Sequence, residues 1–222
     1  MPKDTSAKGV LGDVDCEHID TIVLLYPSLG LCILSFEDRD FASRLARFYN
    51  QWIADCCAPT KGWLRGVGVI WMEHGQVVID ITRNAKELGI AATLVPPVLN
   101  ARNLEHPDLG PFYAAIVERG MPLSMHGAPS VHLPQIGVDR FKNYIQVPCI
   151  SFSFDQMTAI AALVSNGVVE RHTQLRVVFM EVGAGWPHSS SIACTSITRS
   201  GEIGFERGWR HDPRDYLAEG NI

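Results

Sequence analysis

The sequence contains no dense run of lysine or arginine, and its formal net charge is -5 at pH 7. Nucleic acid and an anionic membrane surface are therefore disfavoured as main partners. The first nine residues are polar and lack the apolar segment of a secretory signal. The most apolar stretch, residues 22–36, is broken by Pro27 and Gly30 and is shorter than the roughly 20 residues that span a bilayer. We therefore expect a cytoplasmic protein without a membrane-spanning segment.

Several metal and cofactor motifs are also missing. None of the six cysteines forms a C-x-x-C pair, so neither a zinc–thiolate site nor a disulfide framework is indicated. The cysteines are typical of small buried hydrophobic residues in a reducing compartment. The eight histidines form no H-x-H or H-E-x-x-H pair. No G-x-G-x-x-G follows the first apolar run, which weakens the case for a dinucleotide-binding fold.

What the sequence does contain is an alternation of short apolar runs with helical stripes. Five runs predict buried parallel strands, namely residues 19–26, 64–70, 90–95, 122–126 and 175–182. Apolar residues at helical spacing fill the four gaps, at residues 41–56, 77–88, 112–119 and 155–170. This order predicts βαβ units with a parallel sheet. Two architectures fit, a doubly wound open sheet and part of a (β/α)₈ barrel.

Local signals set the expected ends of these elements. Asp38 or Asp40 is placed to cap the first helix, and Gly89 stands where the second should end. The first predicted strand should end where Pro27 to Gly30 begins, and a long loop should run from Gly127 to about Phe152. From Pro187 onward no helical stripe is evident, and Asp212 to Leu217 resembles a turn into another element.

Two polar residues stand near strand ends, where parallel α/β folds place their sites. His126 ends the fourth predicted strand, and Glu181 lies near the end of the fifth. The alternative for His126 is a hydrogen-bonded core or loop histidine, and for Glu181 a buried salt-bridge partner. His132 lies six residues beyond His126, in the long predicted loop, where it could face the same site.

Seven stretches between residues 19 and 186 carry a family resemblance through their order and spacing. They are residues 48–54, 64–70, 85–90, 100–108, 122–126, 167–171 and 175–186. Together they resemble the amidohydrolase superfamily, in the branch related to aminocarboxymuconate-semialdehyde decarboxylase.

The resemblance implies a partial (β/α)₈ TIM barrel of the metal-dependent hydrolase type, in which the second to sixth strands are present. It implies a divalent metal, often zinc, with His126 as the fifth-strand ligand. Glu181 would be the catalytic residue on the sixth strand, relaying a proton if burial raises its pKa. Asn103 and His132 would bind substrate. The implied reaction is decarboxylation or hydrolysis of a small carboxylated or aromatic compound.

The sequence also departs from the family pattern. The resemblance implies four metal ligands: an H-x-H pair on the first strand, the fifth-strand histidine and an aspartate on the eighth strand. No H-x-H precedes Ile19 and the aspartate has no counterpart, so three of the four expected ligands are absent and metal affinity should be poor. We expect one domain over residues 1–222, with an irregular tail from residue 187. The alternatives are a catalytically inactive binding or assembly partner and a metal-free enzyme with Glu181 as base. Unpaired sheet edges would favour a homo-oligomer.

Overall fold

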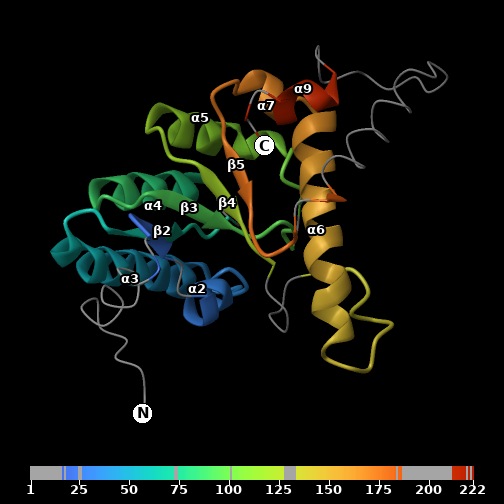
Figure 1. Cartoon of the computed structure of the whole chain (residues 1–222), viewed down its shortest axis with the longest axis horizontal. Helices are drawn as coiled ribbons and strands as arrows, with labels where there is room; N and C mark the ends of the chain where they lie inside the picture. The colour runs from blue at the N-terminus through green and yellow to red at the C-terminus, as the bar shows by residue number, and fades with distance from the viewer. Residues whose placement is uncertain are drawn as a thin grey trace.

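The computed structural model describes residues 17, 19–24, 27–72, 75–100, 102–127, 134–183, 185–186, 212–218, 220 and 222. Five strands form one parallel sheet in the order β1-β2-β3-β4-β5. They are β1 (Ile22–Leu24), β2 (Leu64–Val69), β3 (Ala92–Val95), β4 (Leu123–Met125) and β5 (Val177–Phe179). A doubly wound sheet would reverse its strand order, whereas this sheet adds each strand on the same side and curls into a half-barrel (Figure 1). The predicted partial barrel is confirmed.

Each predicted strand contains an observed one, and helices occupy all four gaps, as predicted. The described helices are α2 (Pro27–Ile33), α3 (Arg39–Cys57), α4 (Gly75–Glu87), α5 (Gly110–Glu118), α6 (Gln146–Ser165), α7 (Val168–Arg171) and α9 (Pro213–Ala218), with 3₁₀ turns η1 (Ala58–Thr60) and η2 (Pro107–Leu109). The first strand ends before Pro27, as predicted, and Pro27 itself begins α2. Proline is tolerated in a first helical turn, whose N–H groups lack helical partners in any case.

Helix α3 is fixed at its start and along one face. Of the two aspartates that could cap it, Asp38 does so, its carboxylate accepting from the Phe41 N–H at 2.9 Å. The face toward the sheet buries Ala42, Ala46 and Ile53. This face packs on β2, whose alternating Gly66 and Gly68 leave room for it: a Cβ on Gly66 would lie 3.0 Å from Ile53. The R-G-V-G-V sequence of β2 thus permits close helix–strand packing.

Helix α6 begins earlier than the sequence predicted. The expected loop up to Phe152 is wrong in part, because α6 starts at Gln146 and places Pro148 within its first turn. Its N-terminal half extends past the sheet (Figure 1). Among the described residues, α6 is the one helix long and apolar enough to cross a membrane, with a mean hydropathy of 1.4, and core helices of soluble proteins meet the same criterion. The expectation of no membrane partner stays a prediction.

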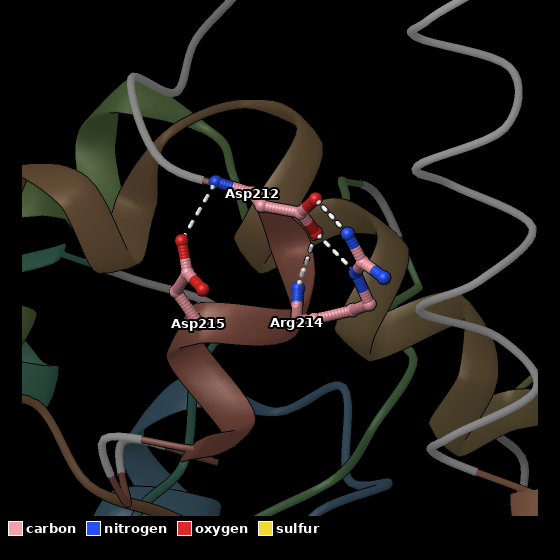
Figure 2. Close-up of polar contacts among 3 residues, drawn as sticks. All are labelled: Asp212, Arg214 and Asp215. Atoms are coloured by element: carbon pink, nitrogen blue, oxygen red, sulfur yellow. Dashed lines mark hydrogen bonds and ion pairs between the residues drawn. The ribbon is translucent and has the colours of Figure 1, made fainter.

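The turn predicted at Asp212 is the start of α9 (Figure 2). The Asp212 carboxylate accepts from the backbone N–H of Arg214 at 3.0 Å and from its guanidinium at 2.9 and 2.6 Å. The Asp215 carboxylate accepts from the Asp212 N–H at 3.2 Å. Farther along, the Tyr216 hydroxyl donates to Glu170 of α7 at 2.6 Å, which docks α9 on that helix. The irregular tail predicted over residues 187–222 is wrong where α9 forms, and its residues 187–211 lie outside the described part of the chain.

Candidate functional site

The site is built on the residue that follows β4. His126 comes directly after Met125, its N–H reaches the Val95 carbonyl of β3 at 3.4 Å, and the residue is 4% exposed. The ring Nδ1 contacts the Gly127 carbonyl oxygen. A carbonyl only accepts, so Nδ1 carries a hydrogen, and in the neutral ring Nε2 then holds the free lone pair. This is the tautomer that a metal-binding histidine adopts.

Glu181 faces that lone pair. Its Oε2 lies 3.2 Å from Nε2 of His126. The prediction that Glu181 sits within a strand is wrong, since β5 ends at Phe179 and Glu181 has a left-handed backbone with φ of 61°. It is 66% exposed, so the burial on which its predicted role depended is absent. A left-handed non-glycine residue is uncommon and is typical of turns and functional sites.

Helix α6 supports both members of the pair. The Phe152 ring lies edge-on to the His126 ring, with centroids 5.7 Å apart. A Cβ on Gly127 would come within 2.8 Å of that Phe152 ring, so glycine is required for this packing. The buried Gln156 amide donates to the Met180 carbonyl at 2.9 Å, next to Glu181. The helix therefore holds the histidine ring from one side and the backbone of the glutamate loop from another.

A second carboxylate, Asp155 of α6, lies near the same strand ends and, unlike Glu181, is buried. Asp155 accepts from the Ile136 N–H at 3.1 Å and lines a narrow gap with Pro96 and Gly127. Burial raises the pKa of Asp155 to about 6, against the lowering effect of the Ile136 hydrogen bond. The carboxylate links α6 to the segment at residues 134–136.

The raised pKa of Asp155 predicts a pH effect on stability. Because the folded pKa exceeds the unfolded value, the stabilising contribution is complete below about pH 4 and is lost as pH rises through about 6. The Asp155→Asn variant keeps the acceptor for Ile136 without the charge. We expect it to match the wild type at pH 4 and to be about 2–3 kcal/mol more stable at pH 7. Urea unfolding at both pH values measures this.

Asp139, an exposed carboxylate, provides the control for that experiment. Asp139→Asn should leave the difference between pH 4 and pH 7 unchanged. Equal pH dependence in the wild type and the Asp155→Asn variant would show that Asp155 titrates as an exposed group does.

Asn103, predicted to bind substrate, is not brought to His126. Its amide donates to Glu105 at 3.1 Å. It lines a cavity of about 640 Å³ together with Glu105, His106, Tyr113 and Arg171, and neither His126 nor Glu181 belongs to this lining. His132 lies outside the described residues. Of the four predicted site residues, the structure therefore places two together.

The pair can be tested for its fit to a divalent metal. Two electron-pair donors facing each other at 3.2 Å require a proton or a cation between them, and imidazole with carboxylate is a donor set that zinc and manganese accept. No group of three or more His, Cys, Asp or Glu suited to a metal occurs within the described ranges. The described residues thus fit two positions of a site that usually takes three protein ligands.

The fold and this pair define a (β/α)-barrel protein with a histidine–carboxylate pair at the carboxyl end of its strands. The amidohydrolase family model matches residues 34–197, and the chain belongs to that family. This confirms the family predicted from the sequence.

A named decarboxylase is similar in sequence to this chain. The chain is 24% identical over 176 residues to 2-amino-3-carboxymuconate-6-semialdehyde decarboxylase of Dictyostelium discoideum, covering 79% of this chain and 46% of that protein. The chain thus spans about half the length of this curated relative.

Solved structures share the fold. A 2,6-dihydroxybenzoate decarboxylase from Rhizobium superposes with a TM-score of 0.75 at 17% identity, covering 98% of this chain and 68% of that one. A dihydroxybenzoic acid decarboxylase from Polaromonas, with bound manganese and 2-nitroresorcinol, gives 0.76 at 18% identity, covering 98% and 66%. A 5-carboxyvanillate decarboxylase from Sphingomonas paucimobilis gives 0.74 at 19% identity, covering 95% and 62%.

Proposed function

We propose that this chain is a metal-dependent decarboxylase acting on a small aromatic carboxylate. The observation that carries the proposal is the approach of the His126 imidazole to the Glu181 carboxylate at 3.2 Å, beyond the ends of β4 and β5. The decarboxylases of dihydroxybenzoate and carboxyvanillate that share the fold support this substrate class over hydrolysis. Substrate contacts by Asn103 and His132 stay proposals.

A divalent metal, zinc or manganese, would be held by Nε2 of His126. When bound, it would polarise the oxygen atoms of the substrate as a Lewis acid. The Nδ1 contact to Gly127 and the Phe152 ring would keep the imidazole oriented toward it. A site with few protein ligands binds metal weakly, so activity should depend on added metal.

Glu181 would supply the proton that decarboxylation needs. Glu181 takes up a proton from water and passes it to the ring carbon that bears the substrate carboxylate. The bond to that carboxylate then breaks, its electron pair returns to the ring, and carbon dioxide leaves. Glu181 remains as a carboxylate and regains a proton from water, to which its 66% exposed side chain has access.

Glu181→Gln tests this role. The amide keeps the size of the side chain but cannot donate an acidic proton, so we expect kcat to fall by about 10²–10⁴-fold. The comparison is made at metal concentrations that saturate both proteins, because the change also removes one of the two donors that face the metal. Release of carbon dioxide from 2,6-dihydroxybenzoate with added Mn²⁺ or Zn²⁺ is the measurement. Glu87→Gln is the control, because Glu87 is an exposed carboxylate on α4. Full turnover in the Glu181 variant would exclude the role, and no turnover of any aromatic carboxylate by the wild type would exclude the function.

A non-catalytic assembly partner is the second candidate. It is favoured by the two-donor metal site among the described residues and by several exposed aromatic side chains on α3. A chain without metal-dependent turnover that forms a defined oligomer would support it. For either function we propose a cytoplasmic location, because the four described cysteines are free, as is typical of a reducing compartment.

A further inference from the structure

Helix α3 carries an apolar stripe that the chain itself leaves open. Phe41, Phe48 and Trp52 are 50%, 68% and 36% exposed, and Leu45 between them is partly buried. These four residues, here called the α3 stripe, follow one another at intervals of four, three and four. That is the spacing of a seam by which one helix packs on another. The stripe is separate from the face of α3 that packs on the sheet, which buries Ala42 and Ala46.

The aromatic surface continues beyond the helix. The Phe36 ring, in the segment between α2 and α3, lies edge-on to Phe41 with centroids 5.0 Å apart, and Phe36 is itself exposed. Helix α3 lies at the outer side of the sheet, beside α2 and α4 (Figure 1). Large aromatic side chains gathered on one exposed helix face typically mark an interaction surface.

The charges beside the stripe indicate what covers it. Arg44 and Asp55 are both exposed and fall on the same flank of the α3 stripe by helical spacing. In an antiparallel pair of identical helices, the same flank of each helix meets. A register that sets Phe48 against Trp52 of a second copy also brings Arg44 to the level of Asp55 of that copy. The arrangement repeats by two-fold symmetry, so the surface is complementary to itself.

We propose that the α3 stripe is a dimer interface, in which α3 packs antiparallel against α3 of a second copy of this chain. Two Phe48–Trp52 contacts form its centre, and two Arg44–Asp55 ion pairs fix its register. A single helix pair with the neighbouring Phe36 buries less than the roughly 800 Å² per partner of a standard interface. The dimer therefore dissociates at concentrations on the order of micromolar.

Sedimentation velocity of the full chain, from about 1 to about 200 µM, measures this association. We expect a monomer–dimer equilibrium in the wild type. Phe48→Glu buries a carboxylate against Trp52 on each side of the two-fold axis and should raise the dissociation constant by about 100-fold or more. Tyr144→Glu is the matched control, because Tyr144 is an aromatic residue of similar exposure, 65%, outside α3. It should leave the dissociation constant unchanged.

A charge exchange tests the register independently of the hydrophobic seam. Arg44→Asp places like charges opposite each other and should weaken the dimer by about 10-fold. Adding Asp55→Arg to that variant restores the opposite charges and should recover the wild-type affinity. The proposal is overturned by a wild type that stays monomeric throughout, by a dimer that Phe48→Glu does not affect, or by a double variant as weak as Arg44→Asp alone. Circular dichroism confirms that each variant is folded.

Discussion

Replacing His126 with alanine should abolish both metal binding and metal-dependent decarboxylation. His126 is the buried member of the pair, and its Nε2 is the one imidazole nitrogen within 4 Å of Glu181 among the described residues. Without it, a single exposed carboxylate remains at that position, which cannot hold a divalent ion at micromolar concentrations. We expect bound metal to fall to background and turnover to fall by on the order of 100-fold or more. Elemental analysis and carbon dioxide release measure the two effects.

His106→Ala provides the comparison for His126→Ala. His106 is exposed and lines the 640 Å³ cavity, away from the pair. It should leave metal content and turnover unchanged. If His126→Ala keeps its metal and activity, His126 is a core histidine, satisfied by the Gly127 carbonyl and the Phe152 ring, and the metal site lies elsewhere. A thermal melt of each variant separates loss of function from loss of fold.

The strand-end position of His126 was predictable because the apolar run before it is short and ends at Gly127. Glu181 was found by the same rule, yet its exposure and left-handed backbone were not, since both depend on where β5 stops. The supporting residues on α6 were missed. Phe152 fell in a predicted loop, because Pro148 and the β-branched residues near it have low helix propensity and so gave no helical signal in the first turns of α6.

The pKa of Asp155 shows the same limit of sequence reasoning. The spacing of apolar residues around Asp155 indicates a helix, but a helical pattern does not predict whether this aspartate is buried or exposed. Asp155 is buried beside Pro96, Gly127 and Ile136. This burial results from packing between segments that are distant in the sequence. Long-range contacts of this kind determine the pKa of a buried group, whereas local periodicity determines where helices and strands form.

The largest stability effect is expected at Asn50, on the buried face of α3. Its side chain accepts from the Val69 N–H at 2.8 Å and donates to the Val69 carbonyl at 3.2 Å, and it is fully buried. The pairing of β1 with β2 runs from Leu64 to Gly66, so at Val69 the asparagine amide takes the place of a neighbouring strand. It satisfies both polar groups of one backbone residue where the sheet edge would otherwise be open.

Asn50→Leu keeps the branched shape of the side chain and its number of heavy atoms but leaves both Val69 groups without that partner. Each buried unsatisfied group costs about 1–3 kcal/mol, so the loss of both partners should lower the free energy of unfolding by about 2–6 kcal/mol. Urea denaturation measures it. Asn84→Leu on α4 is the matched control, because the buried Asn84 Oδ1 accepts no hydrogen bond and little should be lost. An equal loss in the two variants would mean that side-chain shape, and not the bridge to Val69, determines the stability. A loss confined to Asn50→Leu would identify this amide as the link that holds α3 to the end of β2, the strand on which that helix packs.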